Sequence, residues 1–123
     1  MKSTMIALAL LVSGFSQAST MKCYSLEEGF TPALEVNVSE VIDTVNVWGY
    51  DFSLRSATVL EKGVVVGTYN AFGLAGIPSN LQLSLNGVEV GSIDTEANGV
   101  GTRRSGTMKF NGSVTDIGCE VAN

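Results

Sequence analysis

Two cysteines are the residues of this 123-residue chain whose type and spacing most directly indicate covalent chemistry. Cys23 lies near the start of the chain and Cys119 near its end, and the sequence contains no other cysteine. It also contains no CxxC motif and no histidine, which argues against a zinc or redox site. An even pair of cysteines is typical of a disulfide in a chain that is exported, which the N-terminal residues described below predict. The sequence therefore predicts a bond between Cys23 and Cys119.

Catalytic side chains are poorly represented. The absence of histidine excludes Ser–His–Asp and Cys–His nucleophile systems and removes the commonest general base. Pairs of carboxylates such as Glu27 with Glu28, or Asp94 with Glu96, lie in polar stretches. Nothing in these stretches predicts the burial that raises the pKa of a catalytic acid. We therefore expect a protein that is not an enzyme and that carries no cofactor.

One acidic segment has the spacing of half a calcium-binding loop. Asp94, Glu96 and Asn98 place oxygen ligands at alternate positions, and Gly99 is the sixth residue. The twelfth residue is Ser105, where such a loop carries a bidentate glutamate, and no flanking helix is predicted. We therefore interpret the segment as a polar turn, with calcium binding by these three residues as the alternative.

The segment 69–80 is rich in glycine, contains a proline and does not show the alternation of a strand. It nevertheless contains three large apolar residues, Phe72, Leu74 and Ile77. An exposed apolar loop is typical of a contact site. The alternative is a crossover whose side chains cover one end of the fold.

Arg103 and Arg104 are the only adjacent pair of basic residues. Their guanidinium groups could contact an anionic group on a partner, and the alternative is a solvated loop. Trp48 and Tyr50 flank Gly49, and we expect these aromatic rings to pack in the core or at its rim, with the lining of a ligand cavity as the alternative.

The elements that must position these residues are predicted to be strands, because apolar residues alternate with polar ones along most of the chain. The alternation is clear over 34–39, continues over 41–48 and recurs over 52–60. The three consecutive valines of 64–66 favour a buried strand segment, since β-branched residues fit a pleated sheet.

Asn86-Gly87, between the alternating runs 81–85 and 88–90, is the strongest hairpin signal. A two-residue turn would pair Leu85 with Val88, Ser84 with Glu89, and Leu83 with Val90. Asn98-Gly99 and Asn111-Gly112 predict two further turns.

In the last predicted strand, Ile117, Cys119 and Val121 share one face, as do Met21 and Cys23 near the start. The disulfide would then join the first and last strands. Short strands separated by frequent turns are typical of all-β folds. We predict a small antiparallel β-barrel or β-sandwich of about 7–9 strands, closed by one N-to-C-terminal disulfide.

The first eighteen residues have the pattern of a secretory signal peptide. Lys2 precedes an apolar run over 5–12, which is too short to span a bilayer, and Ser16-Gln17-Ala18 offers a cleavage site. We therefore expect a single domain over 19–123, exported to the periplasm or the extracellular space, without a transmembrane segment. The net charge of −5 argues against nucleic-acid binding.

Composition and motifs together favour a non-enzymatic module that binds a protein, including an inhibitor-like role against a basic partner. Its contact residues would be Phe72, Leu74 and Ile77, with Arg103 and Arg104 as a second site. A structural envelope or fibre component that assembles through edge strands is the alternative. A barrel that binds a small ligand is the second alternative.

Overall fold

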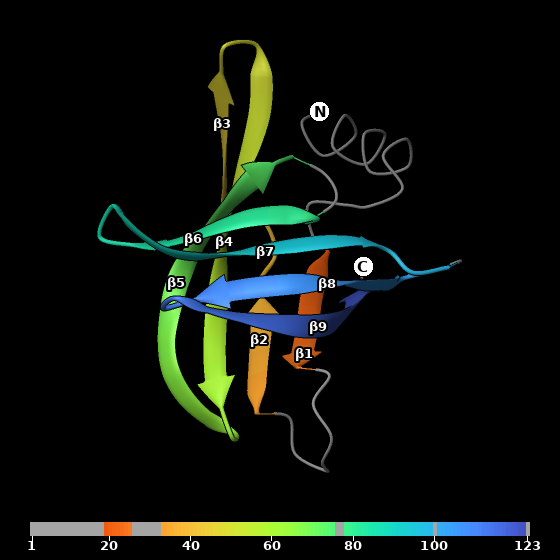
Figure 1. Ribbon diagram of the computed structural model, residues 1–123. Coiled ribbons are helices and arrows are strands. Elements are labelled where there is room, and N and C mark those ends of the chain that lie inside the picture. Colours follow the sequence, from red (N-terminus) through yellow and green to blue (C-terminus); the bar gives the residue numbers. More distant parts are fainter. Residues whose placement is uncertain (1–18, 26–32, 76–77, 100, 123) are drawn as a thin grey trace.

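The computed structural model describes residues 19–25, 33–75, 78–99 and 101–122, and this part of the chain forms nine antiparallel strands (Figure 1). The predicted all-β class is confirmed. The predicted signal peptide lies outside the described residues. The strands are β1 (Thr20–Ser25), β2 (Leu34–Val38), β3 (Asp43–Val47), β4 (Tyr50–Glu61), β5 (Val64–Leu74), β6 (Asn80–Leu85), β7 (Val88–Ala97), β8 (Arg103–Phe110) and β9 (Ser113–Ala122).

Eight of these strands close into a barrel. The sheet order is β2-β1-β9-β8-β7-β6-β5-β4-β3, and β2 also pairs with β4. This pairing runs from Leu34 opposite Glu61 to Val38 opposite Ala57 and joins the two ends of the sheet. β3 pairs with β4 alone and is therefore a ninth strand outside the barrel wall. Closure decides between the two architectures that the sequence left open, because a sandwich has no such continuous ring of pairs.

The barrel interior is filled by apolar side chains. Every barrel strand contributes at least one of them, whereas all five residues of β3 are exposed. The core residues are Met21, Cys23, Val36, Val38, Ala57, Val59, Ala71, Leu81, Leu83, Ile93, Met108, Phe110, Ile117, Cys119 and Val121. Within the described residues, no helix has the length and hydropathy needed to cross a membrane.

The disulfide predicted from the sequence is confirmed. Cys23 and Cys119 lie directly opposite each other in the β1–β9 pair, with an S–S distance of 2.07 Å. Both cysteines are buried, and the bond joins the first and last strands of the barrel as expected. Their sequence separation is 96, so the bond closes a loop that contains almost all of the described residues.

Four hairpins use two-residue turns in which both residues have positive φ, the geometry that matches the twist of paired strands. The predicted turns at Asn86-Gly87 and Asn111-Gly112 are confirmed. The other two turns, Trp48-Gly49 and Lys62-Gly63, lack the asparagine that marks such a turn in a sequence.

Three local expectations are wrong. Leu83 lies opposite Gly91 rather than Val90, because a register shift follows the correctly predicted Leu85–Val88 and Ser84–Glu89 pairs. The valines of 64–66 are exposed at the free end of the β4–β5 hairpin. The segment 69–80 is not a continuous loop, since β5 extends to Leu74.

Gly106 lies where two neighbouring strands approach closely, and a Cβ atom there would overlap the Asp94 backbone carbonyl of β7. We expect Gly106→Ala to lower the free energy of unfolding by about 1–3 kcal/mol, because backbone must move. Thermal unfolding measures the effect. Lys109→Ala, at an exposed position of the same strand, is the control and should change stability by less than about 0.5 kcal/mol. Equal melting temperatures for the two variants would contradict the prediction.

Candidate functional site

A three-stranded element projects from one end of the barrel (Figure 1). Residues 57–61 of β4 pair with β2 in the barrel wall, whereas residues 50–54 pair with β3 beyond it. The end of β5 continues along β4, with Leu74 opposite Phe52. We call residues 43–54 and residues 72–74 together the arm.

The apolar side of β4 changes from the interior to the exterior where the arm begins. In the barrel, Ala57 and Val59 point inward and are buried. Because side chains alternate along a strand, Ser53 and Asp51 lie on that same side in the arm. The outward side of the arm instead carries Tyr50, Phe52 and Leu54.

The strands on either side of β4 extend this apolar outer face. Residues paired across strands project to the same side. The apolar pairs are Val47 with Tyr50, Val45 with Phe52, Phe52 with Leu74, and Leu54 with Phe72. Asp43, opposite Leu54, is the charged residue of this face. The rings of Phe52 and Phe72 are stacked, with 5.1 Å between their centroids and 9° between their planes.

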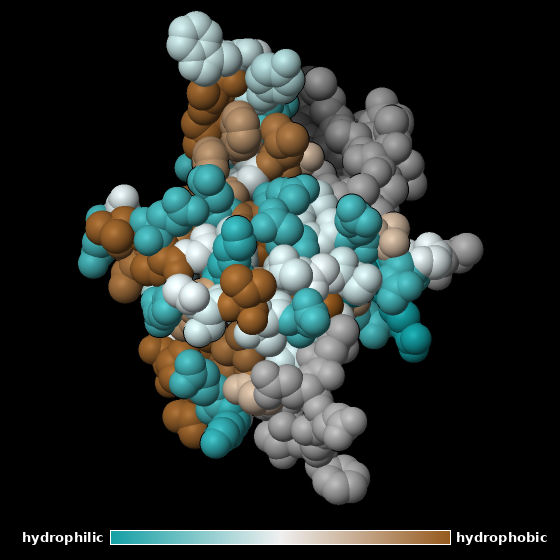
Figure 2. All heavy atoms as spheres, viewed as in Figure 1, coloured by the Kyte–Doolittle hydropathy of each residue, from teal (hydrophilic) through white to brown (hydrophobic). Residues whose placement is uncertain are grey.

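The opposite face of the arm is polar. It carries Thr44, Asn46, Asp51 and Ser53, and the Asn46 Nδ2 donates to the Asp51 Oδ1 at 2.9 Å. The arm is therefore amphipathic, with its apolar side turned outward, and Figure 2 shows hydrophobic side chains gathered on it below the tip.

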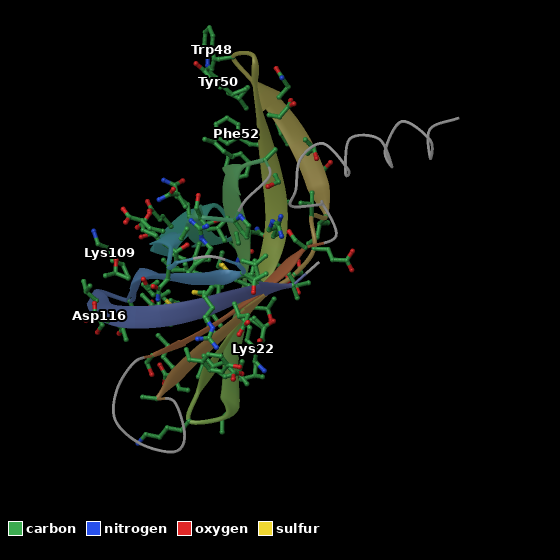
Figure 3. All side chains as sticks on the ribbon, turned by 90° about the vertical axis from the view of Figure 1, so that its right-hand side faces the viewer. Lys22, Trp48, Tyr50, Phe52, Lys109 and Asp116 are labelled. Atoms are coloured by element: carbon green, nitrogen blue, oxygen red, sulfur yellow. A yellow bond between two sulfur atoms is a disulfide. The ribbon has the colours of Figure 1, made fainter. Side chains whose placement is uncertain are left out.

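Trp48 forms the tip of the arm and is 93% exposed (Figure 3). Its φ of 54° lies in the left-handed region, which is unusual for a bulky side chain and costs about 1–2 kcal/mol. Asparagine or glycine suits this turn position better. Tyr50, next to the tip, is 66% exposed. The prediction that these two rings pack in the core or at its rim is wrong, and nothing in the stability of the fold explains a tryptophan here.

Arg55 lies at the base of the arm and is 1% exposed. Its Nη1 donates to the carbonyl oxygens of Ser19 at 2.6 Å and Ser39 at 3.1 Å. Its Nη2 donates to the Ser19 hydroxyl at 3.3 Å. Burial lowers the pKa of the guanidinium from its ordinary value, because desolvation disfavours the charged form. Arg55 thus connects β4 to residues next to β1 and β2, beneath the arm.

A groove of about 480 Å³ lies between the arm and strands β6 and β7. β5 pairs with β6 only over residues 70–72, so the two strands separate at Leu74. Aromatic and aliphatic side chains of the arm form one side of the groove, and polar and acidic side chains form the other. Its lining includes Phe52, Phe72, Leu74, Asn80, Glu89 and Asp94.

The predicted apolar contact residues are placed differently from the expected loop. Phe72 is half-buried against Phe52, and Leu74 is 59% exposed at the end of β5. Ile77 lies outside the described residues. The two residues that the structure describes belong to the end of strand β5 in the arm rather than to a loop.

Arg103 and Arg104 lie at the start of β8, which is three positions from β5 in the sheet order. Arg103 is exposed. Arg104 is half-buried, and it donates from Nε to the Thr95 hydroxyl at 2.9 Å and from Nη2 to the Thr95 carbonyl at 3.1 Å. The structure therefore does not bring this pair together with Phe72 and Leu74.

The calcium-loop alternative required a curled backbone over 94–99. Asp94 and Glu96 instead lie in the extended strand β7, where side chains two residues apart are separated by nearly 7 Å along the strand. Asn98 follows the strand. The Asp94 carboxylate accepts hydrogen bonds from Asn80 Nδ2 at 2.9 Å and Ser92 Oγ at 3.3 Å. Among the described residues, no group of three or more His, Cys, Asp or Glu side chains is placed to hold a metal ion.

Sequence reasoning missed the arm, although the sequence contains a signal for it. Tyr50, Phe52 and Leu54 are at even positions, whereas the buried Ala57 and Val59 are at odd positions, and the half-buried Leu60 is the exception near the end of β4. In a strand with one buried face, the apolar residues stay at either odd or even positions along its length. The change from even to odd positions around Arg55 therefore indicates a strand that leaves the core.

Comparison with known proteins does not assign this chain to a family. No protein-family model matches it, and neither a curated protein nor a solved structure shows significant similarity to it. The function is therefore inferred from the geometry.

Proposed function

We propose that this protein is an exported, non-enzymatic module that binds another protein through its arm. The observation that carries the proposal is Trp48, 93% exposed at the tip of a projecting element whose outer face is apolar. Tryptophan and tyrosine are enriched among the residues that contribute most to protein interfaces. A bulky ring held at positive φ in full solvent is costly for the free protein, and binding offers a compensating interaction.

The size of the arm favours a partner with a cleft. The arm has five residues of β3, five of β4 and three of β5, which at about 3.4 Å per residue and about 4.8 Å between strands cover about 210 Å² of flat surface. A stable interface buries about 800 Å² on each side. Contact through the outer face alone is therefore too small, whereas insertion into a cleft would also bury the tip and the part of the polar face beyond the buried Ser53. This geometry also suits an inhibitor-like role.

The charge of the arm favours a basic partner. Asp43 and Asp51 are exposed, and the only basic residue of the arm and its base is the buried Arg55. Complementary charge accelerates encounter and selects among partners more than it raises affinity.

Assembly through edge strands is the second candidate, because β3 is paired on one side only within the described residues. The edge is short, however, and the Thr44 backbone N–H donates to the Asp43 carboxylate at 2.9 Å. Both features hinder strand addition. Sedimentation of the purified protein over a wide concentration range tests this candidate, which requires oligomers that grow with concentration.

The small-ligand alternative has less support, because core side chains fill the barrel interior.

Trp48→Asn tests the proposed function. Asparagine suits positive φ, so we expect the free energy of unfolding to stay the same or rise by up to about 1 kcal/mol. We expect capture of a stoichiometric partner from envelope and secreted fractions to fall at least tenfold, because an interface tryptophan commonly contributes 2 kcal/mol or more. Thermal unfolding and quantitative pull-down with the oxidised protein measure the two effects.

Lys62→Asn is the matched control, since Lys62 has the same positive φ in the two-residue turn of another hairpin and is also exposed. This variant should retain capture. A partner that binds the Trp48→Asn variant as tightly as the native protein would refute a role for the tip.

A further inference from the structure

We infer that the groove at the base of the arm receives a basic side chain of the partner. The partner's contact segment would then carry apolar residues next to an arginine or lysine. This inference rests on the proposed function, and it assigns the chemistry of the segment that lies against the arm.

The groove joins two surfaces of different character. Phe52 and Phe72, stacked on each other, and Leu74 continue the apolar outer face of the arm into it. Asp94 and Glu89, both exposed on β7, line the other side. A segment that crosses the groove therefore contacts aromatic and aliphatic carbon first and carboxylate oxygen next.

The Asp94 carboxylate is held in place by its neighbours. Asn80 Nδ2 donates to its Oδ1, and Ser92 Oγ donates to its Oδ2. Each carboxylate oxygen can accept more than one hydrogen bond, so both can still receive a donor from a ligand. An oriented carboxylate next to aromatic rings suits a guanidinium or ammonium group, which interacts favourably with both.

Lys109 lies beside the acidic side of the groove, opposite Ser92 in the β7–β8 pair. It forms no ion pair with Asp94 or Glu89; over the ranges that the structure describes, the ion pair present joins Lys22 and Glu35 on other strands. The two carboxylates are therefore not neutralised by this lysine at close range. Charge complementarity thus favours a basic occupant over a neutral or acidic one.

Three synthetic peptides of equal apolar content test the inference: acetyl-Leu-Arg-Leu-amide, acetyl-Leu-Gln-Leu-amide and acetyl-Leu-Glu-Leu-amide. Each is titrated into the isotope-labelled, oxidised protein while backbone amide shifts are followed. We expect the arginine peptide to bind about three- to tenfold more tightly than the glutamine peptide, and the glutamate peptide to bind most weakly. The shifts should centre on the amides of Leu74, Asn80, Gln82 and Asp94.

Two double variants distinguish the groove from the general acidity of the chain. Asp94→Asn with Glu89→Gln should remove the preference for arginine. Asp116→Asn with Glu120→Gln changes the net charge equally at exposed positions of β9 outside the groove, and it should preserve the preference. Equal affinities of the native protein for the three peptides, or shifts centred outside the groove, would overturn the inference.

Trp48 does not line the groove, so the Trp48→Asn variant should show the same order of peptide affinities. Partner capture that survives this substitution, together with arginine preference in the groove, would reject the tip and keep the groove. Loss of capture in the Trp48→Asn variant, without any arginine preference in the groove, would reject the groove and keep the tip.

Discussion

Removal of the Cys23–Cys119 disulfide is expected to lower the free energy of unfolding by about 4–5 kcal/mol, the largest effect of any change considered for this protein. The bond closes a loop with a sequence separation of 96, and in the chain-entropy model a loop of about 100 residues contributes about 4.7 kcal/mol. A domain of this size has only about 5–15 kcal/mol in total. The melting temperature should therefore fall by roughly 15–30 °C. Thermal unfolding of the Cys23→Ala, Cys119→Ala variant measures the change.

Native protein with a reductant is the control for the disulfide prediction, because it retains both sulfur atoms in the core. The reduced protein and the double alanine variant should both be strongly destabilised, the variant slightly more since its two side chains are smaller. A fall of less than about 5 °C in both would show that pairing of β1 with β9 is stable without the covalent bond.

Replacement of Arg55 by methionine is expected to lower the free energy of unfolding by roughly 3 kcal/mol. The guanidinium donates to the buried carbonyl oxygen of Ser19 and to the part-buried one of Ser39, and a buried acceptor left without a donor costs about 1–3 kcal/mol. Arg55→Lys keeps the charge but lacks the planar fork that reaches both residues, so it should recover part of the loss. Chemical denaturation of the two variants measures these values.

The arm should respond locally to the loss of Arg55. Ser39 and Ile42 donate backbone hydrogen bonds to Ser56 and Leu54 of β4, directly before β3 begins. Amide exchange at these positions should accelerate more than the global loss of stability accounts for. Arg104→Met, at a half-buried arginine distant from the arm in the sheet order, is the control and should leave this exchange unchanged. Unchanged stability of Arg55→Met would show that methionine packing compensates for the lost hydrogen bonds.

Much of the fold follows from local features of the sequence. Period-two alternation predicts strands because side chains alternate across a sheet, and Asn-Gly predicts tight hairpins because both residues tolerate positive φ. The even pair of cysteines predicted the disulfide, and the apolar residues that share a face with Cys23 and with Cys119 predicted that it joins the first and last strands. These features depend on near neighbours and on the chemistry of single residues, so the sequence alone determines them.

The candidate site could not be predicted from the sequence, because it depends on pairings between strands that are distant in sequence. Alternation shows that the two sides of a strand differ, but not which side faces the interior. In β4 the apolar residues lie on the inward side in the barrel portion and on the outward side in the arm. The projection of Trp48 into solvent follows from the pairing of β2 with one part of β4 and of β3 with the other. The groove forms where β5 and β6 separate. These are contacts between segments distant in sequence, and the free energy of burial that selects them belongs to the assembled barrel rather than to any local stretch of the chain.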